Sequence, residues 1–382
     1  VVGETAVTVG KKELTVSGTF TAENKIYDGN TNAVIDDSGL TLTGVVDGDS
    51  VILNAAAAFA DANAADNIVV SLTDASSISG EDSDNYSLTV SEAPTSAANI
   101  TANELTVINA VAQVKVYDRT DDAVIGGAEL DGVIGSDDVT LANHTAGTFA
   151  QATVGTNIGV TTNMTITGDD ADNYTVAQPV LAADITAKEL TVINAVAQVK
   201  VYDRTDDAVI GGAELDGVIG SDDVTLANHT AGTFAQATVG TNIGVTTNMT
   251  ITGDDADNYT VAQPVLAADI TAKELTVGGT FTAENKIYDG NTNAVIDDSG
   301  LTLTGVVDGD SVILNAAAAF ADANAADNIV VSLTDASSIS GEDSDNYSLT
   351  VSEAPTSAAN ITANELTVIN AVAQVKVYDR TD

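Results

Sequence analysis

Long internal repeats constrain this sequence more than any other feature. Residues 108–192 recur without change at 193–277, a period of 85 residues. Residues 17–107 recur at 278–368 with one difference, a serine at position 17 and a glycine at position 278. A 91-residue unit (type A) and an 85-residue unit (type B) therefore follow one another in the order A, B, B, A. Because each copy must fold in the same way, the chain is expected to be an array of small domains.

Both ends of the chain carry parts of further repeats. Residues 1–16 end in KKELTV, which resembles the AKELTV at the end of type B, so they are predicted to hold the last strand of a preceding repeat. Residues 369–382 repeat the opening of type B and are predicted to form the first strand of a following repeat. The predicted segments are 1–16, 17–107 (type A), 108–192 (type B), 193–277 (type B), 278–368 (type A) and 369–382.

Types A and B are themselves related. Tyr27-Asp28 aligns with Tyr117-Asp118, and the Asn-Tyr pair that ends at Tyr86 aligns with the pair that ends at Tyr174. One fold is therefore expected for all four repeats. The alanine-rich run at 54–66 has helical propensity, but its type B counterpart contains glycine and threonine, so no helix is predicted there.

Alternating apolar residues indicate strands. Apolar residues recur at every second position in three stretches. These are Ile158, Val160, Met164 and Ile166, with Thr162 as the exception; Ile68, Val70 and Leu72; and Ala112, Val114 and Val116, set against Gln113, Lys115 and Tyr117. Asp- and Gly-rich turns separate these stretches. Six or seven short strands per repeat predict an all-β fold, a tandem array of small Greek-key or immunoglobulin-like β-sandwich domains. Since no flexible linker separates the repeats, the array is expected to form an extended rod.

The charge excludes several classes of partner. The chain has 12 Lys and Arg against 56 Asp and Glu, a formal net charge of −44. Such a surface repels phosphate, so nucleic acid is not expected as a partner, and no apolar stretch is long enough for membrane insertion in this segment. There is no cysteine, which excludes disulfides and cysteine catalysis.

Five ordered sequence blocks in each repeat resemble a known family. In the first type B copy they are KVYD (115–118), LDGVIGSDDVTL (130–141), GTFA (147–150), TITGDDADNYTV (165–176) and ADITAKELTV (183–192). This pattern is similar to the YDG/MBG ("mostly bacterial Greek key") tandem repeats of large secreted bacterial surface adhesins. The resemblance implies an extracellular stalk at the cell surface without enzymatic activity. The glycine after Tyr-Asp is present as Gly29 and Gly290 but is replaced by Arg119 and Arg204 in type B.

The sequence offers little catalytic chemistry. Its two histidines, His144 and His229, occupy the same position in identical copies, and type A has none. They are interpreted as loop or edge residues. No phosphate-binding glycine loop or metalloprotease motif occurs, so the protein is predicted not to be an enzyme. Lys25 and Lys115 could in principle form a Lys-Asn crosslink, but a strand-edge lysine that opposes aggregation is the favoured interpretation.

Acidic turns are the one place where a ligand is predicted. Asp82 and Asp84 in type A, and Asp170 and Asp172 in type B, lie just before the Asn-Tyr pair that every repeat contains. Their carboxylates could supply oxygen ligands to calcium. The alternative is that Asp simply favours turns and keeps the surface hydrated.

Two functions fit these observations. The first is a non-catalytic stalk that extends a giant secreted adhesin, with neighbouring repeats of the same chain as its partners. The alternative is a segment of an extracellular filament or sheath, assembled by lateral or strand-exchange contacts between chains.

Overall fold

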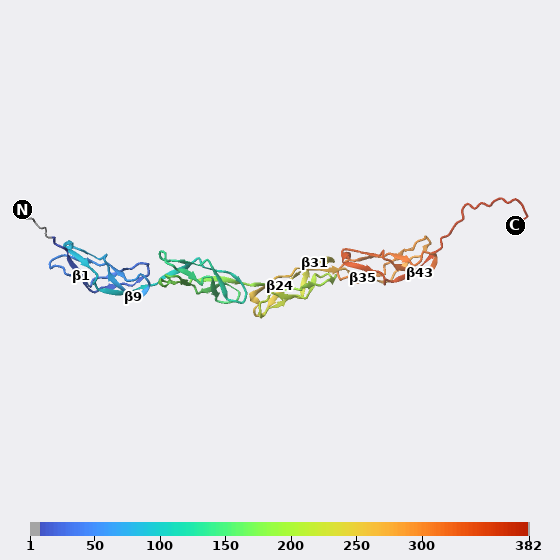
Figure 1. The fold of residues 1–382 in the computed structure, drawn as a ribbon. Helices are drawn as coiled ribbons and strands as arrows, with labels where there is room; N and C mark the ends of the chain where they lie inside the picture. The colour runs from blue at the N-terminus through green and yellow to red at the C-terminus, as the bar shows by residue number, and fades with distance from the viewer. Residues whose placement is uncertain (1–7, 381–382) are drawn as a thin grey trace, which may run out of the picture. The chain divides into compact units, whose positions relative to one another are not determined.

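The computed structural model describes residues 8–380, which contain four β-domains numbered here as repeats 1 to 4 along the chain (Figure 1). The chain divides into two compact units, one ending at Lys188 and the other beginning at Glu189. The first unit holds repeat 1 (type A) and repeat 2 (type B), and the second holds repeat 3 (type B) and repeat 4 (type A). Within residues 8–380 there is no α-helix, and the helical elements are four single 3₁₀ turns: η1 (Ser83–Asn85), η2 (Ala171–Asn173), η3 (Ala256–Asn258) and η4 (Ser344–Asn346).

Type A builds two main sheets. In repeat 1 the first sheet places β1 (Lys12–Gly18) between β11 (Tyr86–Thr89), which is parallel to it, and β6 (Leu40–Thr43), which is antiparallel. The second sheet has the order β3-β12-β9-β8-β4, with β3 (Lys25–Ile26), β12 (Thr95–Thr101), β9 (Ala65–Leu72), β8 (Ala57–Phe59) and β4 (Asn32–Ala33). Two short pairs complete the domain: β7 (Ile52–Asn54) with β10 (Ser77–Ser79), and β2 (Thr21–Ala22) with β5 (Ile35–Asp36).

Type B has the same plan with a wider second sheet. In repeat 2, β13 (Asn103–Ile108) lies between β17 (Glu129–Asp131) and β22 (Tyr174–Val176). The second sheet has the order β14-β16-β19-β20-β23-β15, with β14 (Val111–Ala112), β16 (Asp122–Gly126), β19 (Ala146–Phe149), β20 (Gly155–Thr162), β23 (Leu181–Thr186) and β15 (Lys115–Val116). β18 (Thr140–Ala142) pairs with β21 (Thr165–Thr167).

Repeats 3 and 4 repeat these topologies. The strands of repeat 3 are β24 (Lys188–Ile193), β25 (Val196–Ala197), β26 (Lys200–Val201), β27 (Asp207–Gly211), β28 (Glu214–Asp216), β29 (Thr225–Ala227), β30 (Ala231–Phe234), β31 (Gly240–Thr247), β32 (Thr250–Thr252), β33 (Tyr259–Val261) and β34 (Leu266–Thr271). Those of repeat 4 are β35 (Lys273–Gly279), β36 (Thr282–Ala283), β37 (Lys286–Ile287), β38 (Asn293–Ala294), β39 (Ile296–Asp297), β40 (Leu301–Thr304), β41 (Ile313–Asn315), β42 (Ala318–Phe320), β43 (Ala326–Leu333), β44 (Ser338–Ser340), β45 (Tyr347–Thr350) and β46 (Thr356–Thr362).

The core of each domain lies between its two main sheets. In repeat 1, Val16 of β1 shares one buried cluster with Val70 of β9 and Ile100 of β12. Alternate residues of a strand point to opposite faces, so one face of each sheet supplies the aliphatic core and the other faces water. The predicted all-β tandem repeats are confirmed, and each domain is a two-layer sandwich.

Two of the three predicted alternations are confirmed. Ile68, Val70 and Leu72 are all buried in β9, and Ile158 and Val160 are buried in β20. The alanine-rich run contains β8 and the start of β9 rather than a helix, as the alignment with type B predicts.

The third alternation is wrong. Ala112 is buried, but Val114 and Val116 are 62% and 55% exposed while Tyr117 is 4% exposed. β14 pairs with β16 at one edge of the six-stranded sheet, and β15 pairs with β23 at the other. The chain changes pairing partner between Ala112 and Lys115. The alternation of inward and outward side chains therefore does not continue from β14 into β15.

The structure moves the predicted repeat borders. Residues 12–16 were assigned to a preceding repeat, but they lie in β1, which pairs with β6 and β11 of repeat 1. These ELTV segments therefore open a domain instead of closing one, and the borders at 107, 192 and 277 are displaced in the same way by β13, β24 and β35. The predicted first strand at 369–382 contains no strand up to Arg380, and 381–382 lie outside the described residues. The same sequence at 108–121 of repeat 2 forms β14 and β15, which pair with β16 and β23.

Candidate functional site

The joint between successive repeats is the best-defined polar site in each unit. A single residue, Ala102, separates the last strand of repeat 1 (β12) from the first strand of repeat 2 (β13). In the second unit Ala272 alone separates β34 from β35. One extended residue leaves little conformational freedom, so the side chains at the two domain ends are brought into contact.

In the first unit, two tyrosines from different repeats share one carboxylate. The hydroxyl of Tyr27, from the Tyr-Asp-Gly segment of repeat 1, donates a hydrogen bond of 2.8 Å to Oδ2 of Asp137 in repeat 2. The hydroxyl of Tyr174 donates to the same oxygen at 2.7 Å and accepts a 3.0 Å hydrogen bond from the backbone N of Ile134. The two rings meet edge to face, with centroids 5.3 Å apart.

The second unit repeats this arrangement between repeats 3 and 4. Tyr202 donates a 3.0 Å hydrogen bond to Oδ2 of Asp310, and Tyr347 donates to the same atom at 2.5 Å. The rings are again edge to face, 5.4 Å between centroids. The motif is therefore independent of which repeat type comes first.

A copy of the same tyrosine at the end of repeat 4 shows what the next repeat contributes. Tyr27 is 5% exposed, whereas Tyr288, its counterpart in an identical segment of repeat 4, is 41% exposed. The difference comes from contact with repeat 2, because the sequence around both residues is the same. The first tyrosine of the motif thus belongs to the joint and not to the core of its own domain.

The joint environment raises the pKa of its tyrosines. Burial is the larger cause and the hydrogen bond to the neighbouring aspartate the second; together they raise the pKa of Tyr174, Tyr202 and Tyr347 to about 12. The pKa of Tyr27 is raised for the same reasons. Each tyrosine must stay protonated to donate to a carboxylate, so the joint requires the neutral phenol.

A buried asparagine adds a second contact between the same domains. Asn173, in the Asp-Asn-Tyr segment of repeat 2, accepts a 2.7 Å hydrogen bond from the backbone N of Ala64 and donates to Oδ1 of Asn63 at 3.1 Å. Its counterpart Asn346 accepts from the backbone N of Val239 at 3.0 Å. The loop before each Asn-Tyr pair is therefore fixed against the preceding domain.

The residue after Tyr-Asp touches the next domain in both units. Gly29 lies so close to repeat 2 that a Cβ added to it would be 3.2 Å from Cγ2 of Ile134. Arg204, at the same position in repeat 3, donates from Nη1 to the carbonyl oxygen of Asp308 at 2.8 Å, and its Nε is 3.3 Å from Oδ1 of Asp310.

The predicted calcium ligands have other partners. Oδ2 of Asp82 accepts a 2.8 Å hydrogen bond from the backbone N of Ser50, and Oδ2 of Asp170 accepts one from Asp138. Asp84 and Asp172 lie in the single turns η1 and η2. Within residues 8–380, no group of three or more His, Cys, Asp or Glu side chains could hold a metal ion. Calcium binding at these four residues stays a prediction.

The remaining sequence candidates take structural roles. Nζ of Lys25 forms an ion pair of 2.5 Å with Asp28 and donates to the carbonyl oxygens of Asn30 and Asn32, which closes the Tyr-Asp-Gly turn. Partial burial raises the pKa of Asp28, but hydrogen bonds from Lys25 and Asn30 outweigh it and lower that pKa overall. His144 is half-buried in a turn, and its Nδ1 has no hydrogen-bond partner.

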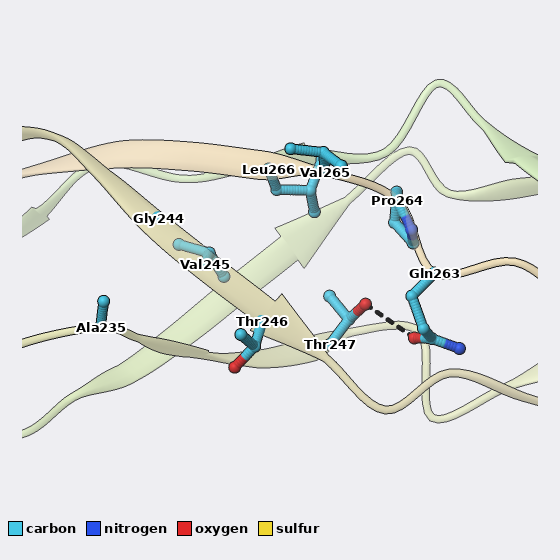
Figure 2. Close-up of a pocket in the computed structure, with 9 residues that line it drawn as sticks. All are labelled: Ala235, Gly244, Val245, Thr246, Thr247, Gln263, Pro264, Val265 and Leu266. Atoms are coloured by element: carbon cyan, nitrogen blue, oxygen red, sulfur yellow. Dashed lines mark hydrogen bonds between the residues drawn. The ribbon is translucent and has the colours of Figure 1, made fainter.

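Figure 2 shows an apolar hollow on repeat 3, between β31 and the segment leading into β34. Pro264 and the exposed Val265 lie at its rim, and the polar contact drawn there is a 2.8 Å hydrogen bond from Thr247 to Gln263. No Asp, Glu, His, Lys, Cys or Tyr side chain lines this hollow, so its lining supplies no general acid or base.

Sequence reasoning missed the joint because its members are far apart in the chain. Tyr27 and Asp137 are separated by 110 residues, and neither is unusual within its own repeat. A signal was nevertheless present: Asp49, Asp137 and Asp310 occupy the same aligned position, although type A and type B differ at most neighbouring positions.

These features define an all-β tandem-repeat protein in which the two domains of each unit are joined directly and share buried polar contacts. The family model of the YDG domain matches residues 10–97, 101–181, 186–266 and 271–358. The chain therefore belongs to the YDG domain family and carries four tandem copies of it.

Solved structures give a more distant likeness. The chain is similar to Drosophila N-cadherin EC1-4 at 9% identity, covering 91% of this chain and 92% of that one, with a TM-score of 0.24. It is similar to N-cadherin EC1-3 of the same organism at 8% identity, covering 69% and 98%, with a TM-score of 0.19. No curated protein matches the chain. The comparisons match it to no catalytic family, and no helix among residues 8–380 is long and apolar enough to cross a membrane.

Proposed function

We propose that this chain is a non-catalytic extender within a large secreted adhesin, in which tandem YDG domains form a rod that holds a binding region away from the cell surface. The observation that carries the proposal is the joint: one residue between strands, together with a carboxylate that accepts hydrogen bonds from tyrosines of both domains. Such a joint resists bending because bending would expose a buried carboxylate and break its hydrogen bonds.

Repetition of an almost identical domain also supports a spacer role. Length scales with copy number, whereas catalysis or specific recognition needs only one preorganised site. The acidic surface supports it as well, since like charge along the chain favours an extended and soluble array. A location outside the cell, at the surface, is part of the same proposal and is supported by membership of the YDG family.

Small-angle X-ray scattering of the 382-residue chain tests the rod. A domain of about 30 Å per repeat gives a rod on the order of 120 Å, with a radius of gyration of about 35 Å. A compact protein of this length would have a radius of gyration of about 21 Å. A value near the compact limit would contradict the proposal.

A filament-forming segment is the second candidate, and one observation favours it. Residues 363–380 repeat a sequence that forms strands in repeat 2, yet here Leu366 and Val368 are 90% and 86% exposed. An apolar segment able to form a strand can add to a sheet of another chain. Sedimentation velocity at increasing protein concentration tests this: a constant monomer would exclude it, and a ladder of larger species would support it.

A further inference from the structure

The leading face of a type A repeat, defined as its Val-Asp-Gly-Asp loop and the tyrosine behind it, forms a cradle for a guanidinium group. In repeat 4 these residues are Val307–Asp310 and Tyr347. The Asp308 carbonyl oxygen accepts a 2.8 Å hydrogen bond from Nη1 of Arg204, and Asp310 Oδ1 is 3.3 Å from its Nε. The Asp310 side chain is fully buried, and its Oδ1 accepts no hydrogen bond, so the arginine charge is what compensates this oxygen.

The glycine of the loop is required for this fit. A Cβ added to Gly309 would lie 2.1 Å from Nη1 of Arg204, a distance that no real contact reaches. The arginine side chain therefore occupies space that any other residue at 309 would fill.

The arginine itself is held in an unfavourable backbone conformation. Arg204 has a φ of 69°, the left-handed region that glycine occupies at the same position in type A, where Gly29 has a φ of 75°. A side chain at such a position has a conformational cost that glycine avoids, and the contacts of Arg204 with repeat 4 oppose that cost.

Repeat 1 carries a second copy of the cradle. Its loop, Val46–Asp49, has the same sequence, and Tyr86 donates to Asp49 Oδ2 at 2.5 Å while accepting from the backbone N of Val46 at 3.0 Å. These contacts match those of Tyr347 in repeat 4, so the face is formed before a partner is bound. Val46 is 48% exposed, and nothing lies within 4 Å of a Cβ built on Gly48.

We propose that the leading face of a type A repeat is a recognition site for arginine, which selects a preceding YDG domain with Tyr-Asp-Arg over one with Tyr-Asp-Gly. In this site Asp310 Oδ2 binds the tyrosine hydroxyl of the preceding domain. Asp310 Oδ1 and the Asp308 carbonyl oxygen bind the arginine side chain. The copy on repeat 1 then fits the end of a domain of type B. This inference concerns the order of domains and does not depend on the role of the array as a stalk.

Arginine substitution is the first test, with calorimetry of the full chain as the measurement. Arg204→Gly is expected to lower the melting temperature of the affected domains by about 4–8 °C, the shift typical of losing one strong interaction in a domain of this size. If the arginine only carried backbone strain, Arg204→Gly would raise the melting temperature instead, and that result would overturn the proposal.

Glycine substitution separates the contact from the local strain. Gly309→Ala and Gly48→Ala place the same methyl group in identical loops with φ values of 88° and 98°, but only the first meets Arg204. Gly309→Ala is expected to cost more, and the excess is expected to disappear when Arg204→Gly is combined with it. Equal losses at the two glycines, or an excess that survives removal of the arginine, would overturn the proposal.

Discussion

At the scale of single residues, tyrosine hydroxyls at the domain ends make the contacts that join one domain to the next. Tyr27 and Tyr174 approach one oxygen of Asp137 from different domains, so the carboxylate is satisfied only when both are present. Hydrogen bonds to a charged acceptor are stronger than those between neutral groups, and a buried carboxylate that loses one donor also loses part of its compensation for burial.

Removing one hydroxyl tests this at a single atom. Tyr27→Phe is expected to destabilise the joint of repeats 1 and 2 by about 2 kcal/mol, because the hydrogen bond to Asp137 is lost while the ring remains. Tyr288→Phe is the same change in an identical segment, and it is expected to have little effect because no further repeat packs on Tyr288 among residues 8–380. Chemical denaturation of the full chain measures both, and equal effects would show that the hydroxyl matters within its own domain only.

High pH tests the same residues together. Tyr174, Tyr202 and Tyr347 have pKa values raised to about 12, above the ordinary value of 10. A raised pKa means that the neutral phenol is favoured in the folded state, so its stabilisation is complete below pH 10 and is lost as the pH rises through 12. Absorbance at 295 nm followed together with circular dichroism is expected to show late tyrosine ionisation that coincides with loss of structure; full ionisation near pH 10 in folded protein would contradict this.

The strand is the scale at which sequence patterns determine burial. β43 alternates between core and surface, with Val331 fully buried and its neighbour Val330 48% exposed. Alternating apolar residues correctly predict which side chains face the core wherever a strand keeps the same neighbouring strands along its length. The prediction failed at Val114 and Val116, where the chain passes from one edge of the sheet to the other.

Two neighbouring valines give a direct test of this alternation. Val331→Ala is expected to destabilise repeat 4 by about 2 kcal/mol, through lost apolar burial and the cavity left behind. Val330→Ala, one residue away on the outer face, is expected to change stability by less than about 0.5 kcal/mol. Thermal unfolding of the two variants measures the difference, and similar losses would mean that the register of β43 is not the one described.

Charge acts at the scale of the whole molecule. The net charge of −44 belongs to the repeats, since type A has 14 acidic and one basic residue and type B has 12 and three. Repulsion among these charges opposes folding and is reduced by salt.

Salt and calcium can therefore be separated by experiment. Raising sodium chloride from about 0.02 to 0.3 M is expected to raise the melting temperature, because the shorter screening length weakens the repulsion. Calcium at matched ionic strength is the comparison, with Asp170→Asn as the variant. A further increase in melting temperature with calcium, absent in the variant, would support the predicted site at Asp170 and Asp172. Equal increases with both salts would mean that charge screening alone explains the effect.

The sequence by itself determined the number of domains, their all-β class, their relation to the YDG family and the aliphatic faces of the longer strands. These follow from repetition and from local alternation, which act between residues close in the chain. Only the tertiary structure decided that the ELTV segment opens a domain, because strand pairing with β6 and β11 involves residues far along the chain. It also decided that the Tyr-Asp segment and the acidic turn meet at a joint, since Tyr27 and Asp137 come together only when two sandwiches are joined end to end by one residue.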